Sequence, residues 1–169
     1  PLQPGLAERS THDYERHGTT SLFAALNTAT GEVLGKCYAR HRSVEFKKFL
    51  AEIERAVTAH IRLQLGLDNC GTHTTALIHN WLVKRPRFQL HFTPIIASWL
   101  NLVERWFGII TQKQIRRGSF RSTQELEASI HRYLESHNQQ PKPFIWTKSA
   151  NTILESVGRY CERINDSQH

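Results

Sequence analysis

The feature that most constrains this chain is a short apolar strand pattern that ends directly at an acid. Residues 61–67 alternate apolar and polar side chains and stop at Asp68, which predicts a strand with a carboxylate at its C-terminal end. Patterns typical of a helix over about 74–84 and of a second strand over 88–92 follow. A strand, a helix and a strand in this order imply parallel pairing through a right-handed crossover. Functional sites in such sheets lie at the carboxyl ends of the strands, so Asp68 is the first candidate.

Upstream of that strand, the sequence predicts a β-hairpin and a helix. Apolar runs at 19–27 and 32–39 flank the turn Thr28-Ala29-Thr30-Gly31, as in a hairpin with a glycine-containing turn. Helical spacing over about 44–59, with Ser43 in a capping position, predicts the first helix. The polar residues 1–18 are expected to form an irregular arm, which leaves residues 19–169 as one domain.

Three helices are predicted to close the chain. The first spans about 98–115, and the second begins at the capping box Ser122-Thr123-Gln124-Glu125. The third covers about 147–164, after two prolines, with its apolar residues on one face. This order of strands and helices places the chain in the α/β class.

Composition and charge narrow the partners and the compartment. The net charge is +7 and the isoelectric point about 9.7. Such an excess suits a polyanion, nucleic acid first, although a merely basic enzyme surface explains it equally well. No apolar run approaches the roughly 20 residues that span a bilayer, so no membrane association is expected.

Three scattered cysteines argue against a disulfide framework or a cysteine zinc site, and for a reducing cytoplasm. The chain begins at Pro1 and lacks methionine, so we expect it to be part of a longer protein.

Asp68 is the stronger of two candidate metal ligands. A carboxylate that closes an apolar strand is costly to desolvate unless something pairs with it. A divalent metal ion would serve, and so would an arginine or a backbone N–H of the following turn.

Glu104 is the second candidate. On the predicted helix it neighbours Asn101, three residues before it, and Gly108, four residues after it, which leaves room for a ligand. The alternative is a surface glutamate paired with Arg105 or Arg117.

Several ordered motifs together resemble a known family. The motifs Leu67-Asp68-Asn69 with His73, Thr93-Pro94, and Leu100-Asn101-Leu102-Val103-Glu104-Arg105-Trp106 are similar to the DDE transposase domain of bacterial insertion sequences, and within these to the mariner-related (IS-six-thirty) group. The similarity extends over nearly the whole chain, through His12-Asp13-Tyr14, Gly18-Thr19-Thr20, Ile115-Arg116-Arg117-Gly118-Ser119-Phe120 and Lys142-Pro143-Phe144.

The resemblance implies an RNase H-like fold, a mixed sheet flanked by helices, in which three acids bind two divalent ions. The ions are normally Mg²⁺, with Mn²⁺ as a substitute, and carboxylates are the hard oxygen ligands that Mg²⁺ prefers. By resemblance, Asp68 is the second acid and Glu104 the third, and residues 69–103 between them fit the family's interval. The family further implies DNA as partner (transposon ends and target), a homodimer on DNA, and a nucleoid-associated protein of the bacterial cytoplasm.

The chain departs from the family pattern at its start. The family's first acid lies on the first core strand, upstream of the arm that opens this chain, and Asp13 falls within the arm's own motif instead. We therefore expect two of three metal ligands, and a sheet without the strand between the hairpin and the Asp68 strand. Weak metal binding and no DNA cleavage are expected of this chain alone. The family's N-terminal helix-turn-helix part, which recognises the terminal repeats, is expected to be missing too.

Secondary candidates accompany the two acids. His73 matches the family's histidine after Asp-Asn; it either positions the Asp68 loop, contacts DNA, or is a capping or surface histidine. Asn69 is expected to hydrogen-bond within that loop, or is a turn residue only, and Asn101 is a further supporting residue.

A basic cluster follows the Glu104 helix and consists of Lys113, Arg116, Arg117 and Arg121. It either contacts phosphates or is a solvated helix end whose cations the helix dipole favours. Trp99 and Trp106 either pack in the core or stack on a DNA base.

The predicted function is metal-dependent DNA strand cleavage and strand transfer in the intact protein. Two alternatives belong to other classes. One is a non-catalytic DNA-binding remnant that keeps the basic surface, and the other is a different RNase H-like nuclease, such as a resolvase.

Overall fold

The computed structural model describes residues 18–68, 70–92, 102–143, 155 and 159 of the chain. In chain order its elements are the strands β1 (Ser21–Leu26) and β2 (Val33–Tyr38), helix α1 (Ser43–Ala56), strand β3 (Leu63–Leu67), helix α2 (Ala76–Val83), strand β4 (Phe88–Phe92), helix α3 (Leu102–Ile110), the π-helical turn η2 (Thr111–Ile115) and helix α4 (Thr123–Gln139). Two predicted segments lie almost wholly outside the described residues. They are the arm over 1–18, of which Gly18 is described, and the helix over about 147–164, of which residues 155 and 159 are described.

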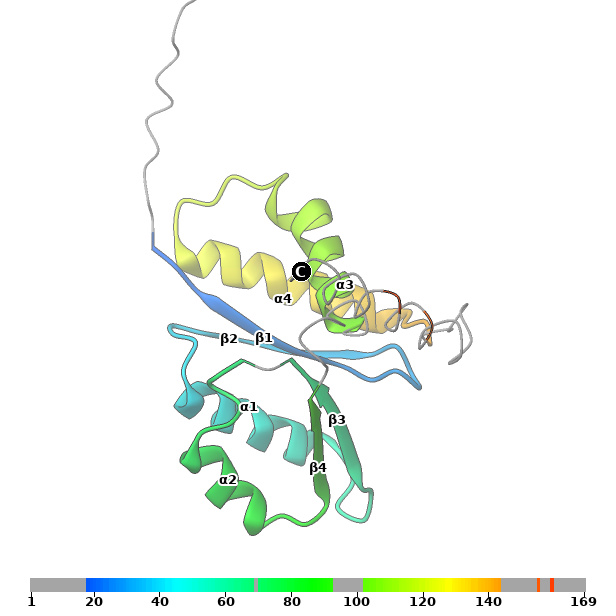
Figure 1. Cartoon of the computed structure of the whole chain (residues 1–169). Helices are drawn as coiled ribbons and strands as arrows, with labels where there is room; N and C mark the ends of the chain where they lie inside the picture. The colour runs from blue at the N-terminus through cyan, green and yellow to red at the C-terminus, as the bar shows by residue number, and fades with distance from the viewer. Residues whose placement is uncertain (1–17, 69, 93–101, 144–154, 156–158, 160–169) are drawn as a thin grey trace, which may run out of the picture.

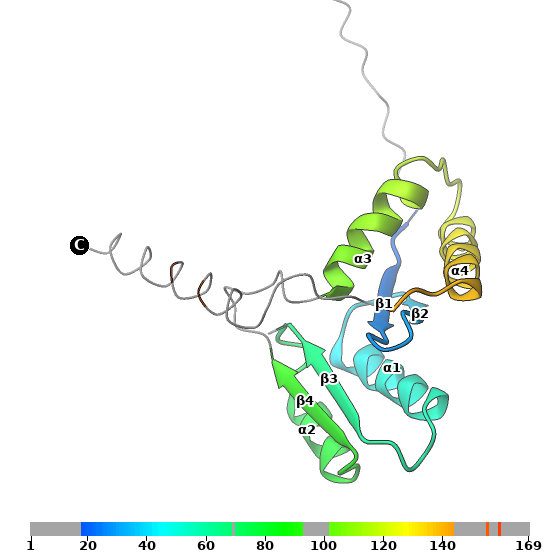
Figure 2. The same ribbon diagram turned by 90° about the vertical axis from the view of Figure 1, so that its right-hand side faces the viewer.

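The β1–β2 hairpin lies in the middle of the molecule. Helices α3 and α4 cover one side of it, while α1, α2 and the β3–β4 pair lie on the other side (Figures 1 and 2). Alternate residues of β1 therefore face two different cores, because successive side chains of a strand point to opposite faces.

Two apolar clusters reflect this arrangement. The first gathers the buried side chains of β1, α1, α2, β3 and β4, namely Phe23, Phe46, Phe49, Leu50, Ile53, Leu63, Ile78 and Phe88. The second joins the hairpin to α3 and α4 through Val33, Trp106, Ile110, Ile130 and Leu134. Trp106 is 4% exposed, so its predicted alternative of core packing is the correct one. Trp99 lies outside the described residues.

The hairpin turn is set by two residues. Asn27 Oδ1 accepts hydrogen bonds from the backbone N–H groups of Ala29 (3.0 Å) and Thr30 (3.3 Å), a turn pattern that asparagine favours. Gly31 adopts φ +81°, and a Cβ there would lie 2.0 Å from the carbonyl oxygen of Lys142. Only glycine fits this position without displacing the backbone.

The strands β3 and β4 pair in parallel, with Leu63 opposite Phe88 and Leu67 opposite Phe92. The predicted strand–helix–strand crossover is thus confirmed, and Asp68 directly follows the last residue of β3.

The hairpin and the β3–β4 pair are two separate two-stranded sheets, rather than one continuous mixed sheet. Leu63 N–H donates to the carbonyl of Arg87, so the backbone groups of Gln64 and Gly66 face the opposite edge of β3. Within the described ranges no strand pairs with that edge or with the outer edge of β1. The strand expected to be lacking between the hairpin and the Asp68 strand stays a prediction.

The first helix begins differently from the prediction. Its N-cap is Arg42, and Ser43 is the first helical residue rather than the cap. Arg42 pairs instead with Glu45 through two hydrogen bonds of 3.0 and 2.6 Å. The hydrogen bonds from Arg42 hold the pKa of Glu45 at about 2, so the ionised acid is retained in the first turn, where the helix dipole favours it.

The start of α4 confirms the predicted capping box with one difference. Ser122 Oγ accepts from the backbone N–H of Glu125 (3.1 Å), while the Glu125 carboxylate accepts from the N–H of Arg121 (2.7 Å) rather than from that of Ser122. At its other end α4 closes the outer edge of β2. Asn138 accepts from the N–H of Val33 and donates to its carbonyl, both at 2.9 Å.

Candidate functional site

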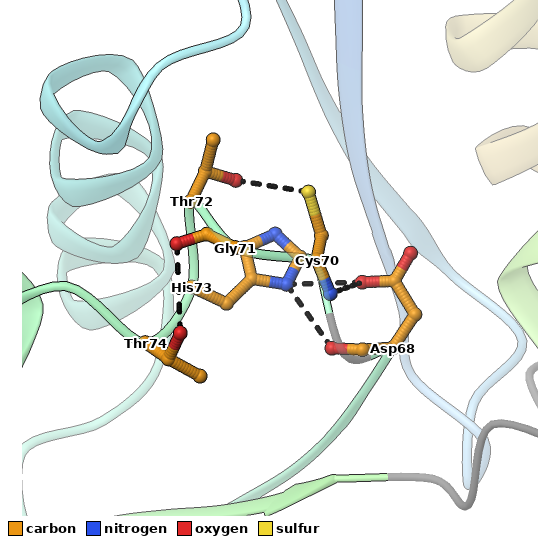
Figure 3. Close-up of polar contacts among 6 residues, drawn as sticks. All are labelled: Asp68, Cys70, Gly71, Thr72, His73 and Thr74. Carbon is orange, nitrogen blue, oxygen red and sulfur yellow. Dashed lines mark hydrogen bonds and ion pairs between the residues drawn. The ribbon is translucent and has the colours of Figure 1, made fainter.

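Asp68 begins a tight loop at the carboxyl end of β3 (Figure 3). Its Oδ1 accepts a hydrogen bond from the backbone N–H of Cys70 at 3.2 Å, the local turn that aspartate forms with the residue two positions on. The same Oδ1 lies 3.0 Å from Nδ1 of His73. Two donors of the loop therefore hold one oxygen of the carboxylate.

His73 is almost enclosed by the protein. The residue is 8% exposed, and its backbone N–H donates to the carbonyl of Cys70 (2.9 Å). Its ring centroid lies 4.1 Å from that of Phe46 on α1. The predicted alternative of a surface histidine is therefore wrong, because the apolar face of α1 covers the ring. Burial also argues against direct contact with DNA.

The Asp68 side chain is 49% exposed, so a ligand has access to it. Of the pairing partners that the sequence left open, the backbone N–H of the following turn is observed, at Cys70. The imidazole of His73 is a further partner that was not among them. Both contacts fall on Oδ1 and leave Oδ2 on the side away from the loop (Figure 3). This is a suitable arrangement for a carboxylate that binds a metal ion through one oxygen, since supporting hydrogen bonds fix such ligands.

Glu104 lies in the first turn of α3 and is exposed. In the described part of the chain no ion pair involves it, so the predicted alternative pairing with Arg105 or Arg117 is not observed. Among the described residues no group of three or more His, Cys, Asp or Glu side chains is placed to share a metal ion. Asn69 and Asn101, the other supporting candidates, lie outside the described residues.

The basic cluster lies at the end of η2 and in the loop before α4. Its four members, Lys113, Arg116, Arg117 and Arg121, are all exposed. None of the ion pairs between described residues uses them, so their charge faces solvent. Gln114 of the same turn anchors η2 to α4 through a 2.8 Å hydrogen bond to Ser129.

The sequence prediction missed the rings that support the site. Phe46 lies within the helix predicted over about 44–59, but neither it nor His41 stands out as a site residue in the sequence. The ring of His41 is stacked on that of Phe23 at 4.6 Å and lies 6.4 Å from that of His73. No local pattern identifies such contacts, because they join three segments of the chain. The spacing of Asp68 and Cys70, by contrast, is that of an aspartate turn and was available from the sequence.

Two further findings concern the cysteines and the helices. Cys37 and Cys70 are free thiols, and burial raises the pKa of Cys37. Within the described residues, no helix has the length and apolar character needed to cross a bilayer.

Comparison with known proteins gives concordant matches. The sequence profile of the family described as "DDE superfamily endonuclease" matches residues 2–127. The Shigella sonnei protein "Insertion element IS630 uncharacterized 39 kDa protein" is 23% identical over 120 residues, which are 71% of this chain and 35% of that protein. The chain thus spans about a third of the length of this curated relative.

Among solved structures, the catalytic core domain of BIV integrase is similar with a TM-score of 0.56 and 18% identity. The match covers 86% of this chain and 93% of that chain. At this identity the likeness concerns the fold, and it confirms the predicted RNase H-like class.

Proposed function

This chain belongs to the DDE superfamily endonuclease family, and from this we propose that it cuts DNA strands and joins them to a target as the catalytic domain of an insertion-sequence transposase. The observation that carries the proposal is Asp68. It stands at the carboxyl end of a parallel strand, with one oxygen held by the loop and a half-exposed side chain. That position is where ligand sites of α/β sheets occur.

We propose that Asp68 and Glu104 hold divalent ions, Mg²⁺ or Mn²⁺ in its place. The donor set fits, because both are carboxylates and Oδ2 of Asp68 lies on the side away from the loop. When bound, such ions activate the attacking oxygen and stabilise the departing one at phosphorus. Asn69, His73 and Asn101 would support the two acids.

The separate sheets support a third acid on an additional strand. Among the described residues, no strand pairs with the outer edge of β1 or with the edge of β3 opposite β4. A strand that paired with both edges would join the two sheets and would end beside Asp68 if it ran parallel to β3. We propose that the functional protein carries its first acid on such a strand. The 169-residue chain alone would then bind metal weakly and leave DNA uncut.

The proposed partners follow from the exposed cations. Lys113, Arg116, Arg117 and Arg121 would contact DNA phosphates of transposon ends or target, which adds salt-dependent affinity. The functional protein would act as a homodimer on DNA and recognise the terminal repeats with an N-terminal helix-turn-helix part. It would work in the bacterial cytoplasm, at the nucleoid.

The test uses the complete reading frame, obtained from the coding DNA upstream of the Pro1 codon. Purified protein is incubated with Mg²⁺ or Mn²⁺ and DNA that carries the element's ends. We expect nicking and strand transfer by the wild type, and loss of both with Asp68→Asn or Glu104→Gln. Glu135→Gln is the matched control, since Glu135 is exposed on α4.

Each outcome has a distinct meaning. Hydrolysis without strand transfer would indicate another RNase H-like nuclease. DNA binding without any metal-dependent cleavage would indicate a non-catalytic remnant, and unchanged cleavage by Asp68→Asn would refute the proposed site.

A further inference from the structure

Four rings connect the Asp68 loop to the hairpin. The ring of His73 packs on Phe46 of α1 (4.1 Å between centroids), and Phe46 lies against Phe23 of β1 (6.3 Å). His41, an exposed residue, is stacked on the buried Phe23, nearly parallel to it at 4.6 Å. We refer to Phe23, His41, Phe46 and His73 as the ring cluster.

The polar contacts of His73 define which nitrogen carries its proton. Nδ1 lies 3.0 Å from Oδ1 of Asp68 and 3.3 Å from the backbone carbonyl of Asp68. An ionised carboxylate and a carbonyl are both acceptors only. Nδ1 must therefore be the donor, in contrast to the Nε2–H form that free imidazole side chains prefer in water.

We propose that His73 is the positioning residue of Asp68. The ring cluster holds the imidazole, and its Nδ1–H together with the Cys70 N–H fixes Oδ1, so that Oδ2 is presented to the metal. The inference rests on the proposed function for its metal, but the orientation of the carboxylate is a property of the loop itself. The two parts of His73 have separate tasks, because its ring packs in the ring cluster and its Nδ1–H orients the carboxylate of Asp68.

These separate tasks allow the two roles to be measured independently. His73→Phe keeps a ring against Phe46 and removes the donor. His73→Asn keeps a donor near the position of Nδ1 and loses most of the ring. His79→Phe is the matched control, since His79 is an exposed histidine on α2.

The experiment uses the full 169-residue chain, labelled with ¹⁵N and ¹³C. Mn²⁺ alone is titrated, and its apparent affinity is read from the paramagnetic broadening of the Cys70 and Gly71 amide signals. Outer partners of metal ligands typically contribute 10- to 100-fold in affinity. We therefore expect about a 10-fold or greater loss with His73→Phe at little change in Tm. His73→Asn should keep affinity near the wild type while its Tm falls.

Two metal-free measurements separate this inference from the proposed function. The imidazole ¹⁵N shifts of wild-type His73 should report a protonated Nδ1, and the side-chain couplings of Asp68 should report one rotamer in wild type and averaging in His73→Phe. If Asp68→Asn binds Mn²⁺ as well as the wild type, the metal site is wrong, and the Asp68 couplings alone decide the positioning role.

Three results would overturn the inference. They are an unprotonated Nδ1 in the wild type, wild-type Mn²⁺ affinity in His73→Phe when Asp68→Asn has lost it, and an unaltered Asp68 rotamer in His73→Phe. If His73→Phe does not fold, the tautomer of the wild-type chain still decides.

Discussion

Asn138 offers a quantitative test of how the outer edge of the hairpin is closed. Its side-chain amide accepts from the N–H of Val33 and donates to the carbonyl of Val33, both at 2.9 Å. The amide thus takes the place of a neighbouring strand at an edge that would otherwise present unpaired groups. Val33 is 2% exposed, so water does not easily replace these bonds.

The magnitude of the effect of Asn138→Ala follows from these two bonds. Each contributes about 1 kcal/mol net, and a buried group left without a partner costs about 1–3 kcal/mol. Because Asn138 itself is exposed, water will reach part of the edge, and we take the lower end of the cost for each unpaired group of Val33, about 1 kcal/mol. The free energy of unfolding should fall by about 2 kcal/mol, which corresponds to a loss of about 4–8 °C in Tm for a domain of this size.

Urea unfolding followed by circular dichroism and a thermal scan measure this change. Asn138→Asp should lose at least as much, since its carboxylate accepts from the Val33 N–H but repels the Val33 carbonyl. Gln139→Ala, next to it and exposed, is the control and should lie within about 0.5 kcal/mol of the wild type. If Asn138→Ala behaves like the control, the amide does not stabilise the edge and the reasoning is refuted.

Three further predictions concern stability. The pKa of Glu45 is about 2 in the folded chain against an ordinary value of 4.5, so its ionised carboxylate stabilises the fold above pH 4.5, and this contribution to the free energy of unfolding is lost as the pH falls towards 2. The free energy of unfolding in urea should depend less on pH in Glu45→Gln than in the wild type across that window, and an identical pH dependence would contradict this. Leu50 is fully buried, so Leu50→Ala should cost about 2–5 kcal/mol by urea unfolding, against a much smaller loss for the part-exposed Leu77→Ala. Gly31→Ala should lower stability by more than about 2 kcal/mol through its positive φ and its clash, whereas Gly66→Ala, whose Cβ meets nothing within 4 Å, should be nearly neutral.

The sequence predicted the elements whose signals are local. Alternation over 61–67 places β3, and its abrupt end at Asp68 places the acid. The capping box at Ser122 was recognisable because both partners lie within one turn of the helix. The parallel pairing of β3 with β4 followed from chain order alone.

Contacts between distant segments could not be predicted in the same way. Asn138 and Val33 are 105 residues apart in the sequence, and nothing near either residue indicates the pair. The cap of α1 was assigned to Ser43 by residue preference, whereas the pairing of Arg42 with Glu45 stabilises that turn instead. The sequence predicts one α-helix over about 98–115, whereas Thr111–Ile115 form the π-helical turn η2. The hydrogen bond from Gln114 of this turn to Ser129 depends on the packing of α4, which no local pattern indicates.

The two candidate acids are attached to different hydrophobic cores, so their relative position depends on how these cores pack together. Asp68 is fixed by its loop and by the ring cluster, which belongs to the core on the α1 side of the hairpin. Glu104 is carried by α3, whose Trp106 belongs to the core on the α4 side. The cores meet at β1, where Phe23 faces one and its neighbours Leu22 and Ala24 face the other. Close-packed interiors transmit small displacements. The distance between the two acids therefore depends on how both cores pack against β1, a strand that carries neither acid. The resemblance to the family makes Asp68 and Glu104 a candidate pair by their spacing along the chain, and the packing of the hairpin determines whether they can share a metal site.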